Sequence, residues 1–200
     1  ERYAGTPAAT SARQLSAELR RTPEERSGKT ELLVWTTIYG LSLGALIPAA
    51  FDADGPEAYG VGLIVGGPAG FLLGRSLERA QPVSEGQARA ISWGTIWGTW
   101  QGLGWTSALN IGSNEVCDGD LCVVEDPDGK TMVRAALLGS AAGFTTGALL
   151  ARKNIASGTA TTVTFGSLWG TWFGFATSEL ANMDDGDDRM IATLVGGNVG

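Results

Sequence analysis

Cys117 and Cys122 are the residues whose type and spacing most clearly permit chemistry in this chain of 200 residues. Four residues that include a glycine separate them, so a tight turn would bring the two thiols to bridging distance. The spacing favours a disulfide, with two free thiols or a metal or redox pair as the alternatives. Histidine is absent from the sequence, which excludes histidine-based triads, proton relays and zinc sites that use histidine.

Acidic residues form four clusters whose carboxylates are of the type that calcium prefers. The clusters are Asp52, Asp54 and Glu57; Asp118 and Asp120; Asp126 and Asp128; and Asp184 to Asp188. None of them has the ligand spacing of an EF-hand loop. We therefore interpret them as solvated turns and predict no metal site.

Two glycine motifs resemble phosphate-binding loops. Gly28-Lys29-Thr30 resembles the end of a P-loop, but Pro23 stands where that motif needs its first glycine. Gly60, Gly62 and Gly66 resemble a dinucleotide fingerprint, but no strand precedes them. We therefore predict no cofactor and no catalytic residue, and we expect that the protein is not an enzyme.

Glycine and aromatic residues repeat at fixed spacing in three copies. Each copy opens at a glycine, reaches an aromatic residue seven positions later and a second glycine five positions after that; these residues are Gly28, Trp35 and Gly40, then Gly86, Trp93 and Gly98, then Gly158, Phe165 and Gly170. A second apolar stretch also recurs, as Val65 to Gly70, Leu138 to Gly143 and Val195 to Gly200. Such internal periodicity is typical of repeat architectures.

The repeat predicts three hairpins and one preceding segment. Residues 1–27 are predicted to be polar and partly helical, 28–85 to form the first hairpin, 86–157 the second with an acidic, cysteine-containing loop, and 158–200 a truncated third. Because the third copy stops in the middle of its motif, we expect the natural chain to continue past Gly200 with a similar segment.

Five stretches of the chain carry no formal charge, and they are 32–51, 59–74, 90–114, 135–151 and 154–178. Their lengths suit a bilayer core, which takes about 20 residues of helix. Glycine recurs at every fourth position within them, at Gly62, Gly66, Gly70 and Gly74; Gly94, Gly98 and Gly102; Gly139, Gly143 and Gly147; and Gly166, Gly170 and Gly174. On helices these rows would form side-chain-free packing faces, a pattern that resembles glycine-zipper membrane helices.

The sequence thus predicts an all-α membrane protein of tandem glycine-zipper helical hairpins, with about six transmembrane segments. Transmembrane β-barrel segments are the alternative, because a spacing of four is also a multiple of two. Trp93 to Trp105, for example, reads as one lipid-suited row and one row of small residues. A soluble domain packed through glycines is a third possibility.

Charge divides the connections between the apolar segments into two groups. The first group consists of residues 1–31, 75–89 and 152–153, and it holds 11 Lys or Arg and 7 Asp or Glu. The rest of the chain holds 3 Lys or Arg and 14 Asp or Glu. By the positive-inside rule the first group faces the cytoplasm if the membrane is an inner membrane. The acidic, cysteine-containing loop would then lie on the non-cytoplasmic side, where disulfides persist. The net charge of −7 argues against nucleic-acid binding.

Close-packing surfaces are the strongest functional signal in the sequence. We expect a structural or assembly component of a bacterial envelope membrane, with the lipid bilayer and other membrane-protein subunits, including those of a homo-oligomer, as its partners. A passive channel or permease is the alternative, and glycine faces that line water would favour it. The apolar segments hold no Asp, Glu, Lys or Arg, which counts against ion-coupled transport.

Overall fold

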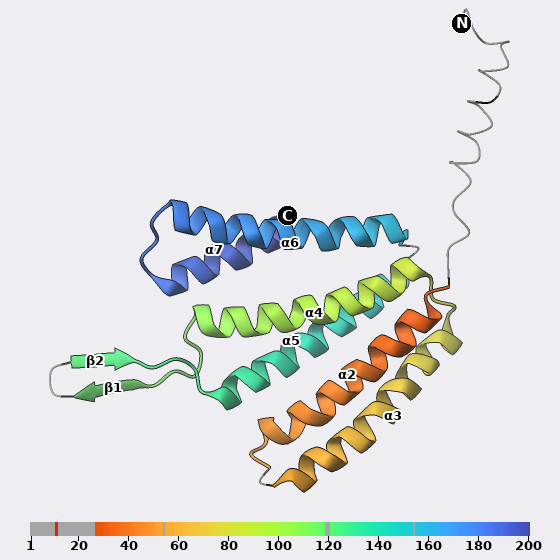
Figure 1. Ribbon diagram of the computed structural model, residues 1–200, viewed down its shortest axis with the longest axis horizontal. Helices are drawn as coiled ribbons and strands as arrows, with labels where there is room; N and C mark the ends of the chain where they lie inside the picture. Colours follow the sequence, from red (N-terminus) through yellow and green to blue (C-terminus); the bar gives the residue numbers. More distant parts are fainter. Residues whose placement is uncertain (1–10, 12–26, 54, 119–120, 154) are drawn as a thin grey trace, which may run out of the picture.

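The computed structural model describes residues 27–53, 55–118, 121–153 and 155–200, together with Ser11. In this part of the chain six helices pair into three antiparallel hairpins that lie side by side (Figure 1). The pairs are α2 (Lys29–Ala50) with α3 (Pro56–Ala80), α4 (Glu85–Ala108) with α5 (Gly129–Leu150), and α6 (Ser157–Leu180) with α7 (Gly186–Val199). The predicted boundaries after residues 85 and 157 fall at the first residues of α4 and α6. The predicted segment 1–27 lies outside the described residues except for Ser11 and Ser27.

The prediction that the apolar segments are helical is confirmed, and the strand alternative is wrong for them. Trp93 to Trp105, which also reads as a membrane strand, lies inside α4. The described strands are β1 (Glu115–Asp118) and β2 (Leu121–Val124), which form a short antiparallel ribbon in the connection between α4 and α5. A row of glycines with period four therefore marks one face of a helix in this chain.

Three helices are long and apolar enough to cross a membrane, namely α2, α3 and α5. The sequence predicted about six crossings, and three of the described helices meet the length and composition of one. The helices α4 and α6 have 24 residues each, but their many threonine, glycine and tryptophan residues lower their mean hydropathy. The helix α7 has 14 residues and ends next to Gly200.

Side-chain caps begin several of these helices. Ser84 and Gln87 form a reciprocal capping box at the start of α4: the Gln87 N–H donates to Ser84 Oγ, and the Ser84 N–H donates to Gln87 Oε1 at 2.7 Å. Asp128 accepts from the Thr131 N–H at 2.7 Å at the start of α5. Pro56 occupies the first position of α3, where no helical partner for its nitrogen is required.

The first helix of each hairpin ends in the same way. Asp52, Asn110 and Asn182 each lie twelve residues after Gly40, Gly98 and Gly170, and their φ angles are 53°, 49° and 50°. The following N–H donates to a carbonyl five residues earlier, at Pro48, Thr106 and Ser178 respectively. Aspartate and asparagine tolerate this left-handed conformation, which ends a helix and satisfies its last carbonyls. The three turns therefore have one geometry.

Glycines bring the two helices of each hairpin into backbone contact. A Cβ atom added to the first glycine of each of the following pairs would overlap the carbonyl oxygen of the second: Gly40 with Gly66, Gly98 with Gly139, and Gly170 with Gly196. One turn further along the first helix, the same holds for Gly44 with Gly62, Gly102 with Ala135, and Gly174 with Ala192. These pairs occupy equivalent positions, so the three hairpins share one packing register.

We predict opposite effects for two alanine substitutions on the same helix, α3. Gly66→Ala places a Cβ atom against the Gly40 carbonyl oxygen, and we expect this overpacking to lower the free energy of unfolding by about 1–3 kcal/mol. Gly60→Ala meets no described atom within 4 Å, so the better helix propensity of alanine should add up to about 1 kcal/mol. Reversible unfolding in mixed detergent micelles measures both changes. Equal effects at the two positions would contradict the register.

Candidate helix-packing and inter-hairpin surfaces

The predicted packing glycines all lie on the inner faces of the hairpins. Those that face backbone atoms of the paired helix are Gly62, Gly66, Gly70, Gly94, Gly98, Gly102, Gly139, Gly143, Gly147, Gly166, Gly170 and Gly174. Gly74 differs, because the nearest group to its added Cβ would be the Thr36 hydroxyl. The sequence prediction omitted Gly40, Gly44 and Gly196 from these faces. They are equivalent to predicted packing glycines in the other copies, and this equivalence was the signal that could have included them.

Between hairpins, the first helix of one hairpin lies against both helices of the next. The helix α2 contacts α4 and α5, and α4 contacts α6 and α7. At the first of these junctions Leu32, Ala88, Ile91 and Ala151 form a small buried apolar cluster. The large side chains that specify how hairpins join therefore lie outside the glycine faces, at the junctions.

Tyr39 anchors the junction between the first two hairpins. Its ring stacks on Phe144 with the centroids 5.3 Å apart, and its hydroxyl lies 3.3 Å from Ser140 Oγ. Both partners belong to α5, and Tyr39 is buried. The Tyr39 ring is thus shielded from solvent, while Ser140 gives its hydroxyl a hydrogen-bonding partner.

A polar network joins α4 to α7 at the second junction. Gln101 Oε1 accepts from Trp105 Nε1 at 2.8 Å and from Asn198 Nδ2 at 3.0 Å. Trp97 Nε1 donates to Asn198 Oδ1 at 3.2 Å. Hydrogen bonds of this kind between helices supplement close packing where apolar contact alone gives little preference for one partner.

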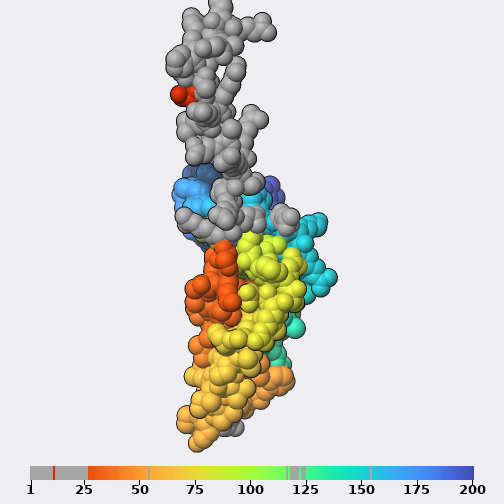
Figure 2. Space-filling view, turned by 90° about the vertical axis from the view of Figure 1, so that its right-hand side faces the viewer, coloured from red at the N-terminus to blue at the C-terminus, as the bar shows by residue number. Residues whose placement is uncertain are grey.

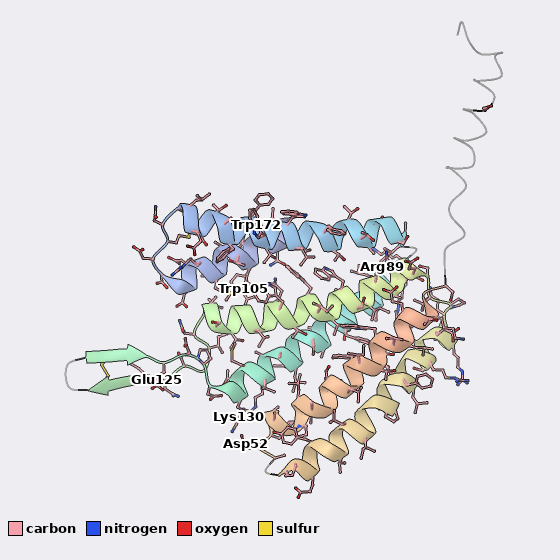
Figure 3. The ribbon with its side chains drawn as sticks, viewed as in Figure 1. Asp52, Arg89, Trp105, Glu125, Lys130 and Trp172 are labelled. Atoms are coloured by element: carbon pink, nitrogen blue, oxygen red, sulfur yellow. A yellow bond between two sulfur atoms is a disulfide. The ribbon has the colours of Figure 1, made fainter. Side chains whose placement is uncertain are left out.

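Charged and polar side chains link the hairpins at both ends of the helices. Arg89 at the start of α4 reaches all three hairpins (Figure 3): it lies 3.8 Å from Glu31, pairs with Glu85, and donates to Thr161 at 3.0 Å. At the other end Lys130 pairs with Asp52, and both are labelled in Figure 3. Exposed pairs of this kind contribute little stability, but they fix how neighbouring helices are aligned.

The two ends of the helices differ in charge. Figure 2 looks toward the end where α3 finishes and α4 begins. That end carries Lys29, Arg75, Arg79, Arg89, Arg152 and Lys153 beside Glu31, Glu78 and Glu85. The opposite end, with the β ribbon in Figure 1, carries most of the acidic clusters. There the Thr131 N–H holds the pKa of Asp128 below its usual value, because it stabilises the carboxylate.

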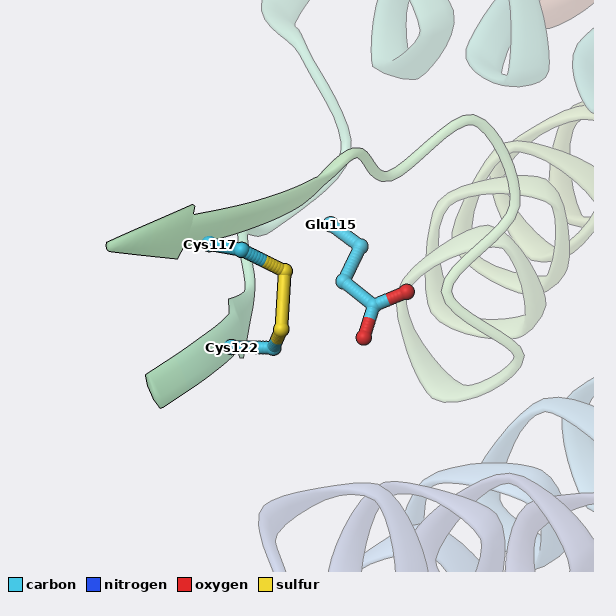
Figure 4. A group of neighbouring side chains, drawn as sticks. All are labelled: Glu115, Cys117 and Cys122. Carbon is cyan, nitrogen blue, oxygen red and sulfur yellow. A yellow bond between two sulfur atoms is a disulfide. The ribbon is translucent and has the colours of Figure 1, made fainter. Parts of the chain in front are cut away.

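The predicted disulfide joins Cys117 to Cys122 across the β ribbon, where the two residues are direct partners (Figure 4). The Glu115 carboxylate lies near the two sulfur atoms, and the three ligand atoms fall within 4.8 Å of one another. A thiolate is the form of cysteine that binds a metal, and a disulfide contains none. Among the described residues no acidic cluster brings three carboxylates together at such distances.

We predict that Gln101→Ala destabilises the junction of α4 with α7. The substitution removes the acceptor of the half-buried Trp105 Nε1 and one of two acceptors of the exposed Asn198 Nδ2, which keeps the Leu194 carbonyl. The loss of these hydrogen bonds should cost about 0.5–1.5 kcal/mol. Thr162→Ala is the control, because its exposed hydroxyl bonds only to Gly158 of its own helix. Thermal unfolding in detergent should show a lower midpoint for Gln101→Ala and an unchanged one for Thr162→Ala. Equal midpoints would contradict the assigned network.

A second prediction concerns the thiols. Cys117 and Cys122 are exposed, so free thiols there would react rapidly with iodoacetamide. We expect no alkylation in the unreduced protein and two alkylated sites after reduction, as counted by mass spectrometry. Labelling of both cysteines without reductant would show that the ribbon is not bridged in the membrane-bound protein.

The chain was also compared with known proteins. No protein family, curated protein or solved structure matches it.

Proposed function

We propose that this protein is a structural or assembly component of a bacterial envelope membrane, built by packing glycine-rich helix faces. The observation that carries the proposal is backbone-to-backbone contact at equivalent glycines in all three hairpins. In lipid the hydrophobic effect does not drive helices together, so association depends on close packing and hydrogen bonds. Glycine rows supply the first of these and are costly in a soluble helix.

The exposed surface supports a bilayer as the main partner. Large apolar side chains are exposed along α3, α5 and α6, among them Ile64, Leu72, Leu138, Phe165 and Trp172. A groove of about 480 Å³ between α2 and α3 is also lined by apolar residues and glycines. Apolar surface of this extent is rare on soluble monomers. Since each hairpin pairs a first and a second helix in one register, we propose that α4, α6 and α7 cross the membrane with α2, α3 and α5.

A passive channel is the second proposal from the sequence, and the position of the glycines weighs against it. A channel wall built from glycine faces would turn those faces toward water. In each hairpin they lie against the backbone of the paired helix instead. The ionisable side chains of the described residues gather toward the helix ends and the connections, which offers no proton or ion relay between the two ends.

The test of this function compares membrane integration with permeability. We expect the protein to stay with membranes washed in alkaline carbonate, to be released by detergent, and to give no unitary conductance in planar bilayers. Gly170→Leu should weaken the third hairpin without creating a conductance, because leucine there meets the Gly196 carbonyl. Discrete conductance in the native protein that Gly170→Leu abolishes would favour the channel.

We propose that the membrane is an inner membrane and that the basic end of the helices faces the cytoplasm, and labelling of the two ends tests this orientation. Asp126→Cys and Arg79→Cys place one new thiol at each end, both at exposed positions. A membrane-impermeant maleimide added to spheroplasts should label Asp126→Cys at once and Arg79→Cys only after permeabilisation. The reverse pattern would invert the orientation.

A further inference from the structure

The contact between the first and second hairpins recurs between the second and third. Tyr39 and Trp97, which directly precede Gly40 and Gly98, hold the same position in their copies. Tyr39 contacts Ser140 of α5, and Trp97 lies against Gly197 of α7. Ser140 and Gly197 are also equivalent, since each directly follows a packing glycine, Gly139 or Gly196. One aromatic side chain thus rests on one equivalent position of the next hairpin at both junctions.

Polar contacts at the two junctions follow the same rule. At the acidic end Asp52 pairs with Lys130, and the equivalent Asn110 donates to the equivalent Asp187 at 2.6 Å. At the basic end Glu31 faces Arg89, and Arg89 in turn donates to Thr161. Each contact joins equivalent positions of consecutive copies, although the chemistry of the pair changes. The junction is therefore one interface formed twice. We call the outer face of a hairpin's first helix its front, and we call the face of the next hairpin that this helix contacts its back.

The third hairpin presents the front of this interface without a described partner. Trp169, the equivalent of Tyr39 and Trp97, is 56% exposed, whereas Tyr39 is 8% exposed. A Cβ atom added to Gly28 would meet the Ser84 carbonyl, between the first and second hairpins, and one added to Gly86 would meet the Ile155 carbonyl, between the second and third. A Cβ atom added to Gly158 has no described atom within 4 Å. Phe165 and Phe173 extend the same exposed aromatic surface along α6.

The first hairpin presents the matching back. Ile64 is the equivalent of Leu194, which is fully buried beneath α4, yet Ile64 is 74% exposed. Gly67 is the equivalent of Ser140 and Gly197, the positions on which the aromatic side chains rest, and within its own hairpin it is buried beneath the Leu41 side chain. Glu57 is the equivalent of Lys130 and Asp187, and it supplies a carboxylate as Asp187 does. Within the described residues, Trp169 at one end of the row of hairpins and Ile64 and Glu57 at the other end are thus exposed, whereas Gly67 is covered by Leu41 of its own hairpin.

We propose that the α6 face of one copy of this chain docks on the α2–α3 hairpin of a second copy and forms the same interface a third time. In this contact the Leu41 side chain turns aside and Trp169 rests on Gly67 as Trp97 rests on Gly197. Asn182 donates to Glu57 as Asn110 donates to Asp187. The Thr161 hydroxyl, which donates to the Ser157 carbonyl within α6, turns to donate to Glu31 of the second copy, so each position finds a partner of compatible chemistry. The inference rests on the proposed function, since it assumes that both copies lie in one bilayer.

The geometry of the contact limits the assemblies that it can form. A front-to-back contact is heterologous, so it generates closed rings or open rows and not two-fold dimers. Within the chain all three hairpins place their acidic turns at the same end (Figure 1). Copies joined by the same interface keep that orientation, so the assembly grows within the plane of the membrane.

Cysteine cross-linking in vesicles tests this contact directly. Full chains that carry Glu57→Cys or Asn182→Cys are reconstituted alone and as an equal mixture in phosphatidylethanolamine and phosphatidylglycerol vesicles, then treated with a short bismaleimide. The native cysteines are bonded to each other and do not react. We expect cross-linked dimers in the mixture, none from either variant alone, and a ladder of higher species from the double variant.

Three further variants make the result decisive. Asn110→Cys with Asp187→Cys should cross-link within one chain, and Asn110 has the same left-handed φ as Asn182, so both tests carry the same strain. Trp169→Ala with Phe173→Ala should lower the mixed dimer about tenfold and leave the internal cross-link unchanged. Leu168→Ala should have no effect, because Leu168, Ile96 and Ile38 are exposed alike at this position in all three copies.

Two results would overturn the proposal. One is the absence of mixed dimers while the internal control cross-links, which would leave the α6 face to lipid or to another protein. The other is dimers of Asn182→Cys alone, which indicate a two-fold contact. If the protein meanwhile resists alkaline carbonate, the proposed membrane function stands and only the docking fails.

Discussion

The close approach of two helix backbones at glycine is the constraint on which the rest of this structure depends. Where Gly98 faces Gly139, no side chain separates the helices, and even a methyl group would overlap a carbonyl oxygen. The attraction across such a contact comes from dispersion between many backbone atoms, and it falls off within a fraction of an ångström. The three hairpins therefore share one register, because small shifts along the helix axis would bring a larger residue against the opposing backbone.

This constraint determines where the distinctive side chains lie. The inner face of each hairpin has no room for them, so aromatic and polar groups lie at the junctions between hairpins and on the outer surface. At the junctions the position is kept while the chemistry varies, as with Asp52 and Lys130 beside Asn110 and Asp187. A hydrogen bond between polar groups tolerates such exchange, whereas the backbone contacts hold only glycine or, as at Ala135 and Ala192, alanine.

The turns at the acidic end combine local rules with this arrangement. Each first helix ends at an aspartate or asparagine in the left-handed conformation, which reverses the chain within a few residues. The second hairpin alone inserts a β ribbon there, and its disulfide closes the ribbon without contributing to the helix interfaces. The insertion is tolerated because it extends away from the helix bundle, past the last glycine contact (Figure 1).

The sequence by itself determined that the apolar segments are helices, that glycine recurs at every fourth position along them, that two cysteines lie within bridging distance, and that basic and acidic residues fall in different connections. These features follow from local spacing: a period of four aligns glycines on one helix face, and a short loop holds two cysteines together. Three helices meet the length and composition of a membrane crossing, fewer than the sequence predicted, because threonine, glycine and tryptophan make α4 and α6 less apolar. Only the tertiary structure decided that the first helix of each hairpin packs on both helices of the next. The physical reason is that contacts such as Tyr39 with Ser140 join residues far apart in the chain, and their chemistry changes from copy to copy, so no pattern of residue types marks them in the sequence.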